Sequence, residues 1–199
     1  MPTEIEAKFL NVNHDDIRAK LREAGATLKH PMRLMRRDMF DHADDRFQKA
    51  HLAEKLRIRD EGDKITITYK RAKADSNYVY EVETTVGSYD DMKQLLQAIG
   101  LKTFTYQESR RETWHFDNVE VVLDEWPWAS PYIEIEGPSE KAIQSAAARL
   151  GFDWEDARFG SPDTVYRAQY PGMTESDSVF SLPEVRFDMP VPQYLQEKV

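Results

Sequence analysis

Three pairs of acidic residues at a spacing of two are the first candidates for chemistry in this sequence. They occur in the stretches TEIEAKF, YEVET and YIEIEG, as Glu4 and Glu6, Glu81 and Glu83, and Glu134 and Glu136. Residues two apart in a strand lie on one face, so each pair would present two carboxylates side by side. The apolar residue between them would then point to the opposite face.

Basic residues follow the same alternation. In LRIR, two arginines alternate with two apolar residues, and the lysine of TEIEAKF continues the face of its acidic pair. A single acidic pair is typical of a solvated sheet face, but repeated acids and bases on matching faces favour an enclosed polar interior. The bases on these faces are Lys8, Arg57, Arg59, Lys70 and Arg111, and Asp124 adds a further carboxylate.

Both signs of charge on one face suit a polyphosphate bound together with a metal ion. Arginine forks match phosphate oxygens, and lysine adds a compact positive charge. Carboxylates would repel the phosphate unless a cation stood between them, and Mg²⁺ or Mn²⁺ prefers such oxygen ligands. We therefore expect a divalent metal cofactor and a small-molecule triphosphate partner.

The elements that must position these residues are mainly strands. Alternation and turn residues predict eight strands, at residues 3–10, 33–40, 54–60, 64–71, 78–86, 103–116, 119–126 and 132–137. Three amphipathic helices, each with a capping residue before it and a glycine near its end, are predicted within residues 13–26, 88–101 and 139–152. A shorter fourth helix is predicted to start near Ser161. The fold class is therefore α+β, with a largely antiparallel sheet that eight strands could close into a barrel with the helices packed outside.

Composition excludes several other kinds of chemistry. The 199 residues include no cysteine, which excludes disulfides, thiolate metal sites and cysteine nucleophiles. A net charge of -9 disfavours nucleic acid or an anionic membrane surface as a partner. No long apolar run and no basic, signal-like start are present, so we expect a cytoplasmic protein. We expect a domain over residues 1–170, followed by a proline-containing C-terminal arm over 171–199 that docks on this domain or on a second subunit of a homodimer.

The ordered set of motifs resembles the CYTH superfamily, the triphosphate tunnel metalloenzymes. TEIEAKF resembles the signature of this family, and EKLRIRD, ITYK, YEVE, RRETW, VVLDE and YIEIEG follow in the order of the family over about residues 3–170. The resemblance implies a tunnel of eight antiparallel strands. It also implies phosphate binding by Lys8, Arg57, Arg59, Lys70 and Arg111, metal binding by Glu4, Glu6, Asp124, Glu134 and Glu136, and catalytic roles for Lys8, Glu81 and Glu83.

The sequence departs from the family pattern in two informative places. Some hydrolytic members have a tyrosine in the second strand, where this chain reads Asp38-Met39-Phe40. A basic residue is common two positions before Arg111, where this chain has Ser109. Arg36 or Arg37 could compensate, and the sequence does not fix which of the two lies on the polar face.

Three functions are compatible with the motifs. The first is metal-dependent hydrolysis of inorganic tripolyphosphate or of a nucleoside or thiamine triphosphate. An adenylate cyclase of class IV type would use the same clamp, with a ribose hydroxyl in place of water as the nucleophile. A polyphosphate- or nucleotide-binding module without turnover is the third, although phosphate capture alone does not require so many acids.

Overall fold

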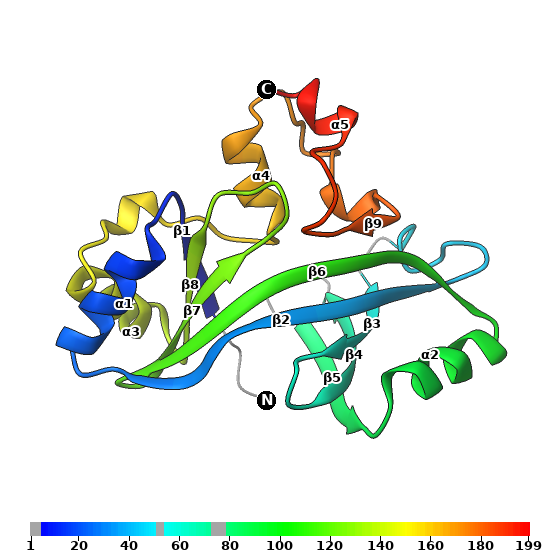
Figure 1. Ribbon diagram of the computed structural model, residues 1–199, viewed down its shortest axis with the longest axis horizontal. Coiled ribbons are helices and arrows are strands. Elements are labelled where there is room, and N and C mark those ends of the chain that lie inside the picture. Colours follow the sequence, from blue (N-terminus) through cyan, green and yellow to red (C-terminus); the bar gives the residue numbers. More distant parts are fainter. Residues whose placement is uncertain (1–4, 51–53, 73–78) are drawn as a thin grey trace. The chain divides into compact units, whose positions relative to one another are not determined.

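The computed structural model describes residues 5–50, 54–72 and 79–199 of the chain (Figure 1). The principal strands are β1 (Ile5–Phe9), β2 (Thr27–His42), β3 (Glu54–Asp60), β4 (Ile65–Ala72), β5 (Val79–Val86), β6 (Leu101–Phe116), β7 (Val119–Glu125) and β8 (Tyr132–Gly137), and β9 (Glu184–Val185) is short. The α-helices are α1 (His14–Glu23), α2 (Tyr89–Ala98), α3 (Glu140–Arg149), α4 (Asp163–Gln169) and α5 (Gln193–Gln196), and two 3₁₀ turns cover Trp154–Asp156 and Val179–Ser181. No helix within the described ranges is long and apolar enough to cross a membrane.

The strands form one sheet in the order β1-β8-β7-β6-β2-β3-β4-β5, with β9 paired to β6. The predicted α+β class with eight antiparallel strands is confirmed, and β9 adds a short parallel pair. The predicted closed barrel is not confirmed. The order has two ends, β1 and β5, and in the described part of the chain no strand pairing joins them. Sequence alternation predicts which faces are polar, but it does not determine whether the two ends of a sheet meet.

Contacts divide the chain into two compact units. The first unit holds the residues up to Arg33, Ser109–Val179 and Phe187–Val199, and the second holds Leu34–Glu108 and Phe180–Arg186. Because β2 and β6 are long, each contributes one part to each unit.

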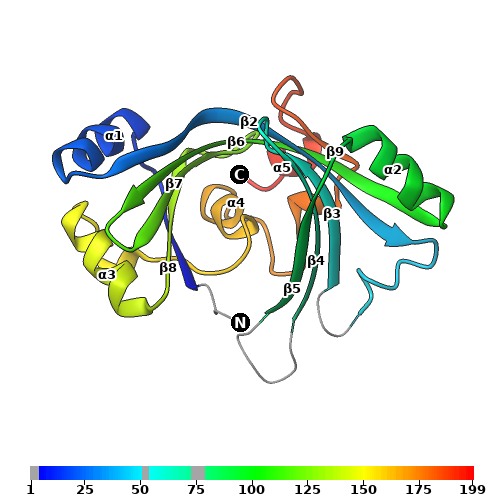
Figure 2. The ribbon, with the colours of Figure 1, turned by 90° about the horizontal axis from the view of Figure 1, so that it is seen from below.

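In the first unit, α1 and α3 cover one face of β1, β8 and β7 (Figures 1 and 2). The core between them includes Phe9, Leu21, Ile133 and Ile135, all essentially without solvent exposure. The helix N-caps are those that the sequence predicts, Asn13 for α1 and Ser139 for α3, and each side chain accepts backbone hydrogen bonds. We call the other face of these strands the polar face of the first unit.

In the second unit, α2 covers one face of the sheet formed by β2 to β5. Leu96 of α2 packs against Phe40 of β2 and Ile58 of β3, all three buried. The predicted cap is again present, since the Ser88 hydroxyl accepts a hydrogen bond from the backbone N–H of Asp91. The opposite face of β2 to β5 is the polar face of the second unit.

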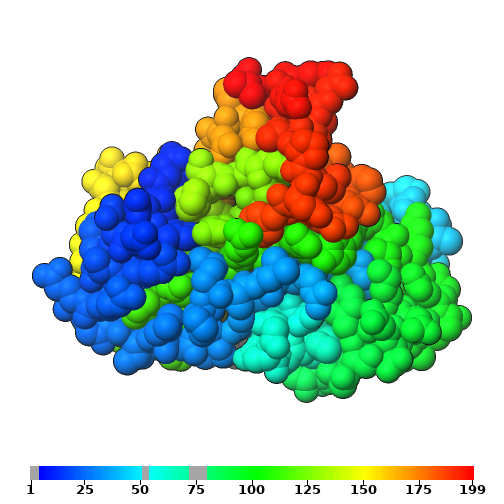
Figure 3. Space-filling view, viewed as in Figure 1, coloured from blue at the N-terminus to red at the C-terminus, as the bar shows by residue number. Residues whose placement is uncertain are grey.

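The C-terminal segment consists mainly of turns and irregular chain, and it contains the 3₁₀ turn Val179–Ser181, the two-residue strand β9 and the four-residue helix α5. Figure 3 shows its last residues, in red, lying against the orange segment that contains α4. Lys198 accepts a backbone hydrogen bond from Gly172 through its carbonyl, and its amine pairs with Asp177 at 3.0 Å. Arg110 stacks on the Phe187 ring, 4.2 Å from its centre. These contacts fix the end of the chain to the rest of the first unit.

Candidate functional site

The polar face of the first unit holds one connected series of ion pairs. The Lys8 amine lies 2.6 Å from Glu6 Oε1 and 3.2 Å from Glu134 Oε1. Arg111 donates to Glu134 Oε2 at 2.9 Å and to both carboxylate oxygens of Asp124. The structure therefore brings five of the predicted site residues together, from four different strands.

Strand register explains why these side chains meet. Lys8 of β1 is directly opposite Glu134 of β8, and Asp124 of β7 is directly opposite Arg111 of β6. Directly opposite residues of an antiparallel pair share a face, with Cβ atoms about 5 Å apart. Glu136, a predicted metal ligand, is opposite Glu6 and so lies on the same polar face.

Because these side chains are buried, the charge of each one strongly affects the pKa of its neighbours. Lys8 is fully buried and Glu134 is 6% exposed. Burial alone would lower the pKa of Lys8, but the carboxylates of Glu134 and Glu6 raise it above its usual value. Burial alone would raise the pKa of Glu134, but Arg111 and Lys8 lower it. Both groups are therefore charged at neutral pH, and each stabilises the other.

Tyr132 is a further member of this face that the sequence reasoning missed. It is fully buried, lies directly opposite Asp124, and its hydroxyl is 3.4 Å from the Asp124 carboxylate. Burial and this carboxylate raise the pKa of Tyr132 well above its usual value, so it stays a neutral donor. Its position two residues before Glu134 places it on the polar face by simple alternation, a signal that could have identified it.

The polar face of the second unit holds five more of the predicted residues, Arg57, Arg59, Lys70, Glu81 and Glu83. Arg57, Thr68 and Glu83 are opposite one another across β3, β4 and β5. The Thr68 hydroxyl donates to Glu83 at 2.7 Å and accepts a long, 3.4 Å hydrogen bond from Arg57. Lys70 pairs with Glu81 at 2.8 Å. The second acidic pair is thus bound to two of the predicted phosphate ligands.

The structure decides between Arg36 and Arg37. Arg37 is directly opposite Arg59 and lies on the polar face, whereas Arg36 pairs with Asp60 on the face that α2 covers. Met39 is directly opposite Arg57, so the second strand presents a thioether on the polar face beside Arg37.

The residues predicted to bind a metal have suitable oxygen ligands, but those that the structure describes are not arranged as a complete metal site. Glu4 lies outside the described residues, and among those described no group of three or more histidine or acidic side chains is arranged to hold a metal ion. The chemistry of the donors nevertheless fits a hard cation. Glu6, Glu136 and Glu120 form a row of carboxylates directly opposite one another across β1, β8 and β7, and carboxylate oxygens are the ligands that a hard cation prefers.

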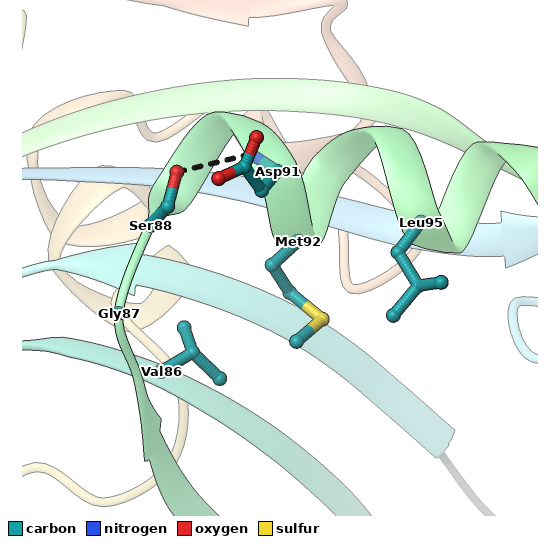
Figure 4. A pocket seen from close by; sticks show the side chains of 6 residues that line it. All are labelled: Val86, Gly87, Ser88, Asp91, Met92 and Leu95. Carbon is teal, nitrogen blue, oxygen red and sulfur yellow. Dashed lines mark hydrogen bonds between the residues drawn. The ribbon is translucent and has the colours of Figure 1, made fainter.

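A surface pocket of about 420 Å³ lies in the second unit (Figure 4). It is bordered by the end of β5 and the first turns of α2 and is lined by Val86, Gly87, Ser88, Asp91, Met92 and Leu95. The Ser88 hydroxyl in it accepts the capping hydrogen bond from the backbone N–H of Asp91. None of the predicted site residues lines it.

Comparisons with known proteins agree with this arrangement. The chain matches the CYTH domain model over residues 2–165. The PH1012 protein of Pyrococcus horikoshii OT3 has a similar structure, with 26% identity, a TM-score of 0.65, and coverage of 82% of this chain and 99% of that one. No curated protein sequence matches the chain significantly.

Two further structures share the fold at lower identity. A candidate adenylate cyclase from Vibrio parahaemolyticus has 12% identity and a TM-score of 0.70 over 82% of this chain and 97% of that chain. A Hippeastrum protein described as an adenylyl cyclase candidate with a dominant triphosphatase activity has 14% identity and a TM-score of 0.54, over 85% of this chain and 96% of that chain. Since the family model covers most of its length, the chain belongs to the CYTH domain family.

Proposed function

We propose that this protein hydrolyses a triphosphate with the help of a divalent metal ion. One observation carries the proposal: each unit has a polar face on which like charges are direct neighbours. On the second unit the neighbours are basic, Arg37 opposite Arg59 and Lys55 opposite Lys70. On the first unit the neighbours are acidic, as Glu6, Glu136 and Glu120 are. Clustered bases provide several donors for phosphate oxygens, and clustered carboxylates provide the oxygen ligands that a hard cation prefers.

The basic residues would bind the phosphate oxygens. Arg57 and Arg59 provide planar forks from adjacent positions of one face, and Lys70 adds a point charge on the next strand. Lys8 and Arg111 would bind phosphate from the first unit, and their charged state is maintained by the acids around them. Because both are already held by carboxylates, they need little reorganisation when the substrate arrives.

Carboxylates of the first unit would hold Mg²⁺ or Mn²⁺. The residues are Glu6, Asp124, Glu134 and Glu136, together with Glu4. When bound, the metal would neutralise phosphate charge and lower the pKa of a coordinated water. Glu81 and Glu83 would accept hydrogen bonds from the attacking water and orient it toward the terminal phosphorus. Hydrolysis then breaks the terminal anhydride bond and releases inorganic phosphate.

A cyclase that makes cyclic AMP from ATP is the second candidate. The structure from Vibrio parahaemolyticus supports it, since that protein is described as a candidate adenylate cyclase. The Hippeastrum protein favours hydrolysis, because its dominant activity is described as that of a triphosphatase. Both reactions use the same triphosphate clamp and differ in the nucleophile.

The test is to incubate the protein with Mg²⁺ or Mn²⁺ and, separately, with tripolyphosphate, ATP and thiamine triphosphate. Phosphate release and cyclic AMP are both measured. We expect phosphate release without cyclic AMP, and no turnover after addition of a chelator. Cyclic AMP with pyrophosphate would reverse the order of the two candidates. The absence of turnover on all three substrates would reject the proposal.

A further inference from the structure

A short segment that follows α3 pairs with the outer side of β1. Lys8 and Arg158 exchange two backbone hydrogen bonds, at 2.8 and 2.9 Å, and form an antiparallel bridge. Along its other side, β1 pairs with β8. The segment around Arg158 therefore continues the sheet of the first unit by one position beyond β1.

Register places the Arg158 side chain on the polar face of the first unit. Directly opposite residues of an antiparallel pair share a face, so this side chain leaves the backbone on the same side as that of Lys8. The two neighbours of Arg158 agree with this alternation. Ala157 is buried in the core that α1 and α3 cover, and the centre of the Phe159 ring lies 5.7 Å from that of Trp154, which packs against the same core. Both neighbours thus point to the helix-covered face, and Arg158 points to the opposite one.

Arg158 differs from Lys8 and Arg111 in its partners. Carboxylates hold both of those bases. Arg158 is exposed, and one of its terminal nitrogens donates to the backbone carbonyls of Glu155 and Ala157, at 3.2 and 3.1 Å. Among the residues that the structure describes, no carboxylate is within ion-pair distance of Arg158, and its Nε and other terminal nitrogen have no acceptor. Since a guanidinium group has five N–H donors, the donors on these two nitrogens are available to a ligand.

A cavity of about 340 Å³ adjoins Arg158 at the end of β1. Phe9, Asn11, Phe152 and Asp156 are among the other residues that line it. Small-molecule sites have volumes of about 300–1,000 Å³, so this cavity has room for a small ligand. Arg158 therefore borders both this space and the face that carries Lys8.

We propose that Arg158 is a further phosphate-binding residue of the first unit, and that it binds a phosphoryl group of the substrate beside Lys8. This inference rests on the proposed function for the class of substrate. Lys8 and Arg111 must share a phosphate with the carboxylates that already hold them. Arg158 can donate two parallel hydrogen bonds to phosphate oxygens without breaking an ion pair. It lies outside the motifs that identify the family, because a bridge to β1 is not visible in the local sequence.

Arg22 of α1 provides a matched control. It is also exposed, but it lies on the helix-covered side of the sheet, where its guanidinium group is 5.8 Å from the centre of the Trp114 ring. Arg158→Gln and Arg22→Gln therefore remove the same charge from opposite sides of the first unit. Neither substitution removes the backbone bonds between Lys8 and Arg158. Thermal unfolding followed by circular dichroism verifies that both variants are folded.

The experiment is calorimetric titration of each protein with imidotriphosphate, an analogue of tripolyphosphate that resists hydrolysis, in buffer with Mg²⁺ at about 0.15 M ionic strength. We expect Arg158→Gln to weaken binding by about ten-fold or more, as the loss of a charge-assisted contact predicts. Arg158→Lys, which keeps the charge but loses the planar fork, should have an intermediate affinity. Arg22→Gln should bind within about two-fold of the wild type, because salt screens a distant exposed charge. Equal affinities of Arg158→Gln and Arg22→Gln would overturn the role of Arg158.

Asp156 separates a contact with phosphate from the shape of the cavity. It lines the same cavity but carries the opposite charge. If Arg158 binds phosphate, Asp156→Asn should bind imidotriphosphate at least as tightly as the wild type, because a repulsive charge has been removed. If Arg158→Gln and Asp156→Asn weaken binding equally, the effect comes from the cavity rather than from the charge, and the role of Arg158 is overturned.

The outcome is distinguishable from the fate of the proposed function. If the wild type binds imidotriphosphate, shows the expected loss in Arg158→Gln and hydrolyses no triphosphate, the role of Arg158 stands and the proposed function fails. If the wild type hydrolyses a triphosphate while Arg158→Gln and Arg22→Gln bind the analogue equally, the proposed function stands and the role of Arg158 fails. A wild type that neither binds the analogue nor hydrolyses any triphosphate would reject both.

Discussion

Replacing Glu134 with Gln would remove a charge that two basic side chains share. Glu134 lies 3.2 Å from the Lys8 amine and accepts from Arg111 at 2.9 Å, and Lys8 is fully buried. A hydrogen bond to a charged group stabilises by roughly 1 kcal/mol more than a neutral one, so the two bonds account for about 2 kcal/mol. Breaking a buried pair costs about 3–5 kcal/mol, because the remaining charge stays buried. In the variant, Lys8 would still be paired with Glu6, and Arg111 would still be paired with Asp124. We therefore expect Glu134→Gln to lower the free energy of unfolding by about 3 kcal/mol, at the lower end of this range.

Urea denaturation at pH 7 would measure this difference in the free energy of unfolding. Glu120→Gln is the control, since Glu120 lies on the same polar face but pairs with Lys29 near the surface, with both side chains more than a third exposed. Loss of the pair between Glu120 and Lys29 should lower the free energy of unfolding by less than about 1 kcal/mol. If Glu134→Gln costs no more than Glu120→Gln, the buried network does not stabilise the fold as we argue.

The stabilities of the wild type and of Glu134→Gln can also be compared as a function of pH. Lys8 and Arg111 lower the pKa of Glu134 below its usual 4.5, in spite of burial. A carboxyl group with a lowered pKa stabilises the folded state above its unfolded pKa, and this contribution is lost as the pH falls through the folded pKa. The difference between wild type and Glu134→Gln should be complete at pH 7 and should shrink below about pH 4.5. A difference that stays constant with pH would contradict the ionic origin.

Three further predictions concern the metal, the C-terminal segment and α2. Glu136→Gln should abolish phosphate release from tripolyphosphate while unfolding by circular dichroism changes little, and retained turnover would reject its role as a metal ligand. Asp163→Asn should lower the free energy of unfolding by about 1–3 kcal/mol, because Asp163 is buried and accepts a hydrogen bond from the Ser178 hydroxyl at 2.8 Å. An unchanged midpoint of urea denaturation would contradict this prediction. Ser88→Ala should cost about 1 kcal/mol by loss of the cap on Asp91, whereas Ser88→Asp should retain most of the stability.

Much of the fold could be predicted because its signals are local. A spacing of two fixes which residues share a face, and the strand registers confirm that Glu6, Lys8, Glu134 and Glu136 do. Capping residues and glycines likewise predict where helices begin and end, as Asn13 does for α1. The predicted start of β2, at residue 33, is too late, since the strand begins at Thr27 and includes Pro31. Pro31 is tolerated there because the described pairing of β2 with β3 begins only at Arg36.

The site could be predicted only in part, because pairing between strands is not a local property. Arg36 and Arg37 are equivalent in the sequence, and only the register with β3 shows that Arg37 is opposite Arg59. Glu61 begins a Glu-Gly-Asp sequence between two predicted strands, which is typical of a hairpin turn. Its side chain is nevertheless buried against Arg59, which alternation from β3 could have indicated if it had been continued one step into the turn.

Several residues of like charge lie directly opposite each other in neighbouring strands of the two polar faces. A fold selected for stability alone would place opposite charges across each strand pair, as Lys70 and Glu81 are placed. Lys8 opposite Glu134 and Arg111 opposite Asp124 also follow that rule. The departures from it are Arg37 opposite Arg59, Lys55 opposite Lys70, and Glu136 opposite both Glu6 and Glu120. Local rules are expected to fail at functional sites. These departures fall on residues to which the proposed function assigns phosphate and metal binding, namely Arg59 and Lys70 for phosphate and Glu6 and Glu136 for the metal.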